Sequence, residues 1–129
     1  MIDFESMKNL SAEEKAMELR KAGYNCCQAV VGALTEDPLM ITAASGFGGG
    51  MGNTQGPCGA LVGAVMAAGI KTGGTGTSRC SRRIYDIFRE RSGAVICRDL
   101  KGLDTGKVLC PCDECVRNGV KAFLDVFEE

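Results

Sequence analysis

The sequence predicts an all-α protein, a single-domain bundle of five or six helices with a glycine-rich loop. Three observations support this fold class. Apolar residues recur at helical spacing, residues typical of helix starts and stops bound those segments, and no strand-like alternation lasts longer than a few residues. A chain of 129 residues suits one domain over residues 1–129 with one moderate core.

Two helices are predicted near the N-terminus. Residues 11–14 have the form of a capping box, and Gly23 is placed to end the helix that follows. Asn25 is a good N-cap for a second helix. Its first turn would hold Cys26 and Cys27.

The middle of the chain joins a glycine-rich stretch to a strongly apolar segment. A short helix is expected over residues 39–44, and the glycines of residues 46–52 predict a loop, because glycine adopts backbone conformations closed to other residues. The Gly-Pro pair at 56–57 predicts a helix with proline in its favoured N1 position and Cys58 in its first turn. Small residues through 59–68 would let a neighbouring helix come close.

Three further segments complete the chain. Ser78 is expected to cap a helix that Gly93 ends, and a shorter apolar segment over residues 94–100 holds Cys97. A loop over residues 102–109 then leads into a final amphipathic helix.

Composition and charge argue against several kinds of partner. The formal net charge is -1 and basic residues alternate with acidic ones, so no basic stripe is available for nucleic acid. The longest apolar run, residues 59–70, is shorter than the roughly 20 residues of a membrane-spanning helix. The N-terminus lacks the features of a secretory signal, which predicts a cytoplasmic protein. The small-residue helix faces would also permit a homodimer.

Eight cysteines and no histidine point to sulfur chemistry. Structural disulfides are rare in the cytosol, so several thiols there favour metal or redox work, although a secreted domain held by four disulfides is the alternative. Most of these cysteines fall near predicted helix starts. A helix N-terminus favours a thiolate and can lower a cysteine pKa to about 3.5–7.5. We therefore expect activated thiols, with small buried apolar residues as the plainer interpretation.

Without histidine, a metal site would use thiolates alone, which suits a four-cysteine zinc site or an iron–sulfur cluster. The spacing of zinc knuckles and of ferredoxins is absent, so only the ligand type supports a metal. Four ligands near helix starts could take part: Cys26, Cys58, Cys97 and one of Cys110, Cys112 and Cys115.

The spacing of the cysteines separates some of them from the others. Cys112 and Cys115 form a C-x-x-C pair on the first turn of the last helix, a spacing that suits redox centres and metal sites alike. Cys26 and Cys27 cannot face the same site, because successive helical residues rotate by about 100°, and we favour Cys26. Cys80 has no cysteine neighbour within fifteen residues and is expected to lie outside the site.

The glycine-rich stretch, residues 46–56, contains no nucleotide-binding motif. It is expected either to bring backbone amides close to a thiolate, cluster or anion beside Cys58, or to act as a flexible lid.

Several short motifs occur in an order that resembles one protein family. They are GYNCCQAV at 23–30, SGFGGG at 45–50, CGA at 58–60, FRER at 88–91, CRDLKG at 97–102 and CDECV at 112–116. Together they resemble the family named for a C, GCAxxG, C, C cysteine pattern, over about residues 20 to 125. The resemblance implies a small helical protein, mostly bacterial or archaeal, with an inferred redox activity and with relatives fused to electron-transfer modules.

Carried over by position, the resemblance implies which cysteines recur in the family. The recurrent positions are Cys26, Cys58, Cys97 and either Cys112 or Cys115, with Cys112 preferred. With Cys112 as the match, the resemblance implies that the remaining cysteines are additions: Cys27, Cys80, Cys110 and Cys115. The GCAxxG segment aligns either with residues 50–52, where Met51 replaces a cysteine, or with residues 58–63, which keep the thiol but stretch the spacing.

The leading hypothesis is a thiol-based redox or electron-transfer protein, with oxidoreductase activity left open. Thiolates of Cys26, Cys58, Cys97 and Cys112 would converge beside the glycine-rich loop and either exchange disulfides or hold an iron–sulfur cluster. Cys110 and Cys115 would be resolving or auxiliary thiols, and a redox partner protein is expected. The alternatives are a structural zinc module with four cysteine ligands and a helical partner-binding protein with buried cysteines.

Overall fold

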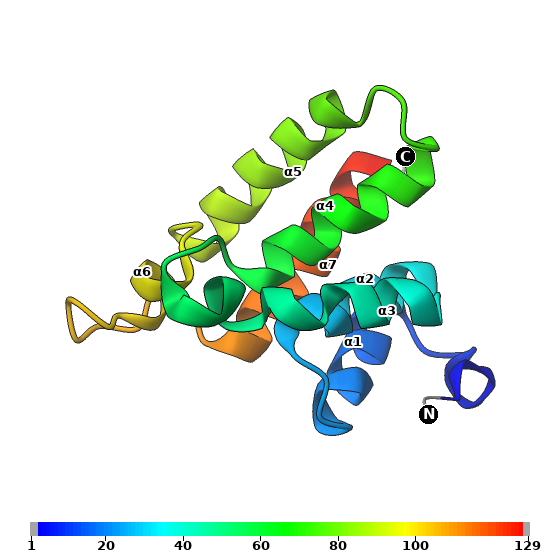
Figure 1. The fold of residues 1–129 in the computed structure, drawn as a ribbon, viewed down its shortest axis with the longest axis horizontal. Coiled ribbons are helices and arrows are strands. Elements are labelled where there is room, and N and C mark those ends of the chain that lie inside the picture. Colours follow the sequence, from blue (N-terminus) through cyan, green and yellow to red (C-terminus); the bar gives the residue numbers. More distant parts are fainter. Residues whose placement is uncertain (1–2, 128–129) are drawn as a thin grey trace.

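The computed structural model describes residues 3–127 and contains no β-strand among them. Its seven α-helices are α1 (Ala12–Lys21), α2 (Cys26–Thr35), α3 (Pro38–Ala43), α4 (Gly59–Thr72), α5 (Thr77–Ser92), α6 (Cys97–Lys101) and α7 (Cys112–Phe127) (Figure 1). The shorter turns are η1 (Phe4–Met7), η2 (Ala44–Phe47) and η3 (Gly50–Thr54). The all-α class is confirmed. The predicted count of five or six was slightly low, because the segment that holds Cys97 forms a separate short helix, α6, in addition to the six that were expected.

The predicted capping box forms at the start of α1, and a second capping box forms at the predicted N-cap of α2. The Ser11 hydroxyl accepts a hydrogen bond from the Glu14 amide at 3.1 Å, and the Glu14 carboxylate accepts one from the Ser11 amide at 2.8 Å. Asn25 and Gln28 make the same reciprocal pair at 2.9 and 3.1 Å. The second box fixes where α2 begins, and so it places Cys26 in the first helical turn.

Helix α4 lies at the centre of the fold and packs against α2, α5 and α7 (Figure 1). Its small residues permit the close approach that the sequence predicts. A Cβ atom added to Gly63 would lie 2.7 Å from the carbonyl oxygen of Cys27, and one added to Gly119 on α7 would lie 2.7 Å from that of Ala60. The backbones of α2, α4 and α7 are therefore nearly in contact.

Helix α4 starts two residues later than predicted. Pro57 is not the first helical residue but forms an isolated antiparallel bridge with Ile96. The Cys58 amide donates to the carbonyl oxygen of Val95 at 2.7 Å, and the Cys97 amide donates to that of Gly56 at 3.0 Å. Cys58 is therefore the N-cap of α4, and backbone hydrogen bonds hold this N-cap beside the start of α6.

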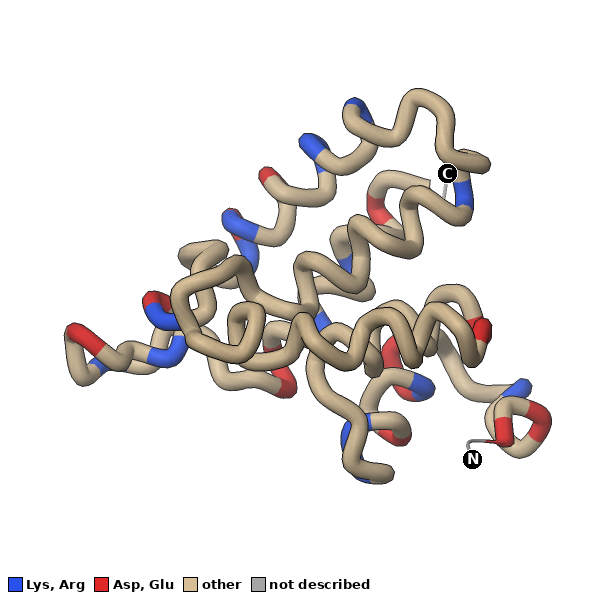
Figure 2. Tube along the Cα trace, in the orientation of Figure 1, with Lys and Arg blue, Asp and Glu red and all other residues tan. Residues whose placement is uncertain are grey.

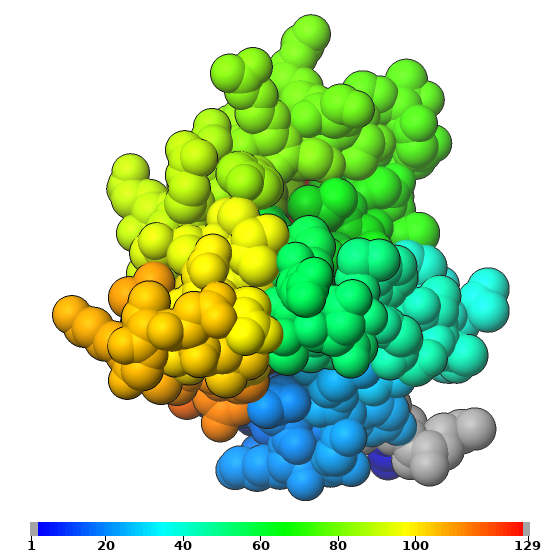
Figure 3. Space-filling view, turned by 60° about the vertical axis from the view of Figure 1, so that its left-hand side comes forward, coloured from blue at the N-terminus to red at the C-terminus, as the bar shows by residue number. Residues whose placement is uncertain are grey.

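The glycine-rich stretch is not the plain loop that the sequence predicts, because it folds into η2 and the π-helical turn η3. Met51, Thr54 and three glycines here have positive φ, a conformation that glycine adopts most easily. A Cβ atom on Gly50 would lie 2.6 Å from that of Cys97, so this glycine lets η3 pack against α6. Figure 3 shows the two segments side by side at the surface.

The charged residues are spread over the chain, with a run of arginines along α5 (Figure 2). The cap of α5 differs from the expectation, because Gly76 rather than Ser78 precedes the helix. Gly93 ends α5 in the left-handed conformation, as predicted. Within residues 3–127, no helix is both long and apolar enough to cross a membrane.

Candidate functional site: a cluster of thiols at four helix starts

Cysteines from the starts of four helices lie within hydrogen-bonding or electrostatic reach of one another. Cys26 opens α2, Cys58 caps α4, Cys97 opens α6 and Cys112 opens α7, with Cys115 one turn further along α7. We call these five residues the thiol cluster. All five thiols are free, and all except that of Cys112 are buried.

Three of the buried thiols lie in a row. The Cys58 thiol is within hydrogen-bonding reach of both Cys26 and Cys115. Cys115 donates to the carbonyl oxygen of Cys110 at 3.5 Å. Cys58 is therefore the central sulfur of the three.

These contacts reverse the expected effect of the helix starts on pKa. The hydrogen bond that Cys26 donates to Cys58, together with burial, raises the pKa of Cys26 well above its usual range. The hydrogen bond to Cys115, and then burial, raise the pKa of Cys58 to about 12. Burial likewise raises the pKa of Cys97. The prediction of lowered pKa values was wrong for these three, because burial and neighbouring thiols outweigh the helix termini.

Backbone amides still point at two of these sulfurs. The Gly49 amide donates to Cys26, and the Ala60 amide donates to Cys58, and each contact lowers the pKa of the thiol it reaches. The Gly49 contact brings an amide of the glycine-rich stretch to a sulfur, as one of the two alternatives expected, but that sulfur belongs to Cys26 rather than Cys58 and is a neutral thiol rather than a thiolate. A Cβ atom on Gly59 would lie 2.5 Å from the Cys26 sulfur, so the first residue of α4 has to be glycine for α2 to approach.

The outer part of the thiol cluster has a different environment. Cys112 is partly exposed, and the Lys101 ammonium at the end of α6 donates a hydrogen bond to its sulfur. Burial opposes the charge on Lys101, but the hydrogen bond to Cys112 and the nearby sulfurs raise its pKa overall. Lys101 therefore stays positively charged beside Cys112.

Cys97 lies between the outer and inner parts. Cys26 and Cys112 both raise the pKa of its buried thiol, whereas Lys101 lowers it. Lys101 was not among the predicted site residues, and its only signal in the sequence is its place in the CRDLKG segment.

Cys110 contributes its backbone to the thiol cluster, while its side chain points elsewhere. Its sulfur accepts a hydrogen bond from the Asn118 amide group at 3.7 Å, and the same group donates to the Ser92 hydroxyl at 2.9 Å. The Cys110 thiol therefore lies between α5 and α7. The structure gives it a packing contact rather than a place in the thiol chain.

Two other cysteines also turn away from the thiol cluster. Cys27 contacts the Met66 thioether, with the two sulfurs 3.7 Å apart, as the rotation between successive helical residues predicts. Burial raises the pKa of Cys27 to about 12. Cys80 lies in the first turn of α5, at the end of that helix away from α6 (Figure 1).

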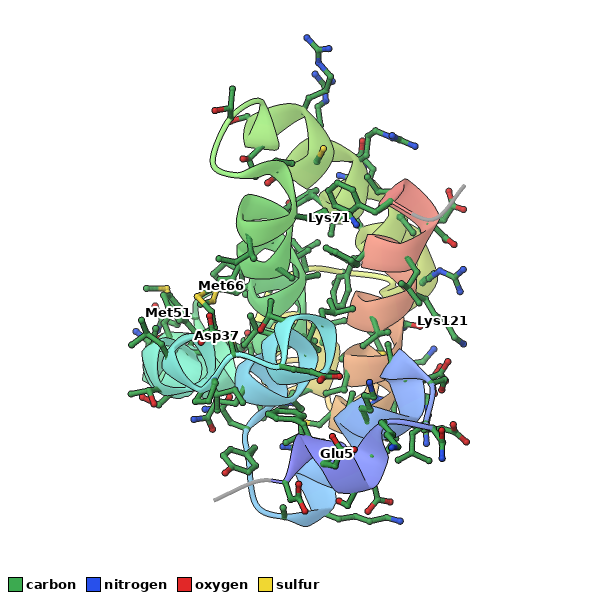
Figure 4. All side chains as sticks on the ribbon, turned by 90° about the vertical axis from the view of Figure 1, so that its right-hand side faces the viewer. Glu5, Asp37, Met51, Met66, Lys71 and Lys121 are labelled. Carbon is green, nitrogen blue, oxygen red and sulfur yellow. The ribbon has the colours of Figure 1, made fainter. Side chains whose placement is uncertain are left out.

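Met51, which replaces a cysteine in one alignment of the GCAxxG segment, is 55% exposed. Figure 4 shows Met51 at the outer edge of the molecule and Met66 projecting from α4. The alternative alignment, residues 58–63, instead contains Cys58, whose sulfur lies inside the thiol cluster. Its two glycines, Gly59 and Gly63, stand where a side chain would collide with α2.

The four proposed metal ligands are all thiols, which is the donor type that zinc and iron–sulfur clusters use. Their arrangement differs from that of a metal site. Among residues 3–127, no three or more cysteine or acidic side chains are grouped so that they could hold a metal ion. The thiols are instead satisfied by hydrogen bonds to one another.

Comparison with known proteins gives one match. No curated protein and no solved structure matches the chain. A family model described as "Putative redox-active protein (C_GCAxxG_C_C)" matches residues 24–126, a span that includes the whole thiol cluster. The chain therefore belongs to this C_GCAxxG_C_C family.

Proposed function

We propose that the protein is a cytoplasmic thiol redox protein, which carries two electrons by opening and closing a disulfide inside the thiol cluster. The observation that carries this proposal is the contact of Cys58 with both Cys26 and Cys115. Two neighbouring thiols that lose two electrons and two protons form one disulfide. The oxidant is a disulfide of a partner protein, which is reduced to two thiols.

The central position of Cys58 gives the cluster two alternative disulfides. Starting from a Cys26–Cys58 bond, the Cys115 sulfur attacks the Cys58 sulfur. The Cys58–Cys115 bond then forms, the Cys26–Cys58 bond breaks, and Cys26 leaves with the proton that Cys115 lost. No net oxidation occurs in this exchange, so the disulfide moves within a buried site that excludes water.

The outer residues supply the route to this buried pair. Cys112 is the most exposed thiol of the cluster, and the Lys101 charge beside it would stabilise a thiolate during attack. Cys97, within electrostatic reach of both Cys112 and Cys26, would connect the outer thiol to the inner ones. In this proposal Cys110 supplies a backbone acceptor, and Cys27 and Cys80 take no part.

The test is to oxidise the fully reduced protein with diamide and map the disulfides by mass spectrometry. We expect one intrachain disulfide that contains Cys58, and its loss in Cys58→Ala but not in the matched variant Cys80→Ala. Reaction confined to Cys80, or only disulfides between chains, would contradict the proposal.

Anaerobic purification, metal analysis and an absorption spectrum distinguish the thiol redox proposal from the iron–sulfur and zinc alternatives. We expect a colourless protein without stoichiometric metal, whose eight thiols can all be titrated. A coloured protein that bleaches on reduction would favour a cluster, and a colourless one with stoichiometric zinc would favour the structural module.

A further inference from the structure

A cleft opens beside the outer thiol of the cluster, between the end of α6 and the start of α7. It has a volume of about 360 Å³ and its lining is mostly apolar. Its lining residues are Lys101, Leu103, Val108, Cys110, Pro111 and Cys112. We call it the loop cleft, because most of its wall comes from the segment of residues 102–111, which projects from the helices (Figures 1 and 3).

The projecting segment carries an unusual share of the exposed apolar side chains. Leu103, Val108 and Leu109 are 52%, 57% and 48% exposed, and they are three of the seven large exposed apolar residues among residues 3–127. Exposed apolar residues scattered singly are common, but a group of them next to a reactive side chain marks a contact surface. Leu109 lines a second hollow, together with Ala94, Asp99, Thr105 and Lys107.

The backbone of the segment also has capacity to bind. The amides of Leu109 and Cys110 both donate to the carbonyl oxygen of Leu100, at 2.9 and 3.2 Å, which holds the segment against α6. Val108 lies between Lys107 and these two anchored residues. Its amide and carbonyl make no hydrogen bond within residues 3–127. An extended peptide could pair with them.

We propose that the loop cleft binds an extended segment of a partner protein, in which apolar residues flank a disulfide that Cys112 attacks. This inference rests on the proposed redox function and names its partner. A polypeptide suits the surface because the apolar side chains lie on a projecting segment with free backbone groups. The loop cleft is widely open to solvent, whereas small-molecule sites enclose most of the ligand.

The attack conserves atoms and electrons. The Cys112 sulfur bonds to one sulfur of the partner's disulfide, and the other sulfur leaves and takes up the proton that Cys112 lost. The Cys97 thiol then attacks the Cys112 sulfur, which breaks the mixed disulfide and releases the second partner thiol. Cys97 and Cys112 are oxidised together by two electrons, and the partner's disulfide is reduced by two.

The probes are short peptides whose one cysteine is joined to thionitrobenzoate, with either valine and leucine or serine and asparagine on both sides. The reduced full chain, in a Cys80→Ala background, is mixed with each peptide and the release of thionitrobenzoate is followed. We expect the apolar peptide to react at least about tenfold faster, because docking buries aliphatic side chains in the loop cleft.

Two double variants make the comparison specific. Leu103→Ser with Val108→Ser should remove the preference for the apolar peptide. The reaction with dithiobis(nitrobenzoate), which carries no peptide, should be unchanged. Leu39→Ser with Ile70→Ser removes comparably exposed apolar side chains elsewhere and should keep the preference. Methylation of the backbone amides of the apolar peptide should slow its reaction, because it blocks pairing with Val108.

The outcomes separate the two levels of the proposal. If Cys112 reacts with dithiobis(nitrobenzoate) but the apolar and polar peptides react at the same rate, docking in the loop cleft is overturned and the redox function stands. If methylation has no effect and a small dialkyl disulfide reacts as fast as the apolar peptide, the cleft binds small molecules. The proposal that it binds a polypeptide is then overturned. If Cys112 does not react even with dithiobis(nitrobenzoate), the redox function fails as well.

Discussion

The inner thiols of the cluster, Cys26 and Cys58, differ from the outer thiol, Cys112, in burial, contacts and charge. All three nevertheless lie at or near helix starts. Cys26 and Cys58 are buried, donate their protons to other sulfurs and have raised pKa values. Cys112 is partly exposed and has a lysine ammonium against its sulfur. The difference teaches that a helix start alone does not determine whether a thiol is activated, because the surrounding charges and burial contribute more.

The largest expected effect is on the rate of alkylation. With a pKa of about 12, Cys58 would be a thiolate in only ~10⁻⁴ of molecules at pH 8, and it is also buried. We expect iodoacetamide to modify Cys112 at least ~100-fold faster than Cys58 in the reduced protein. Timed labelling with mass spectrometry gives the two rates, and labelling of Cys58 first would overturn the division between inner and outer thiols.

The second effect is a loss of stability at high pH. The folded state raises the pKa of Cys27 and of Cys58 from 9.0 to about 12, so between these values the folded protein binds more protons than the unfolded one. The free energy of unfolding is therefore undiminished below pH 9 and falls between pH 9 and 12, by up to ~1.4 kcal/mol per pH unit for each thiol.

Urea denaturation at several pH values, under reducing conditions, measures this slope. Cys58→Ala should make it shallower, whereas Cys80→Ala should leave it unchanged. Equal slopes in the wild-type protein and in Cys58→Ala would show that the inner thiol is not held in its neutral form.

The third effect concerns the close approach of α2 to α4. Gly59→Ala adds a methyl group 2.5 Å from the Cys26 sulfur and should cost roughly 1–3 kcal/mol of folding free energy. The matched control is Gly69→Ala on the same helix, where nothing lies within 4 Å and the change should stabilise the protein by about 0.5–1 kcal/mol. Thermal or urea unfolding compares them, and equal effects would argue against tight packing at Cys26.

The smallest expected effect is on the outer thiol alone. Lys101→Gln removes the charge beside Cys112 and should slow its alkylation at neutral pH by about tenfold, the usual scale for one nearby charge. Lys107→Gln, on the same projecting segment, is the matched control and should have little effect. If Lys101→Gln leaves the alkylation rate of Cys112 unchanged, burial rather than charge would explain why Cys112 differs in reactivity from the inner thiols.

Most of the helix starts could be predicted from the sequence, because capping depends on residues three positions apart. The capping box at Ser11 and the N-cap at Asn25 are as expected. Helix α4 was placed too early, because the bridge between Pro57 and Ile96 joins segments distant in sequence and delays the helix. The glycine-rich stretch was predicted as a loop, because nothing local indicates that η3 packs against α6.

The candidate site divides in the same way. Helical periodicity and capping were enough to place cysteines at the starts of α2 and α7 and to turn Cys27 away from Cys26. They did not show that α6 begins at Cys97, because no capping side chain precedes that helix. The chain of thiols, the raised pKa of Cys58 and the pairing of Lys101 with Cys112 were beyond such signals. Each depends on burial and on partners from other helices, and these exist only once α2, α4, α6 and α7 have packed together.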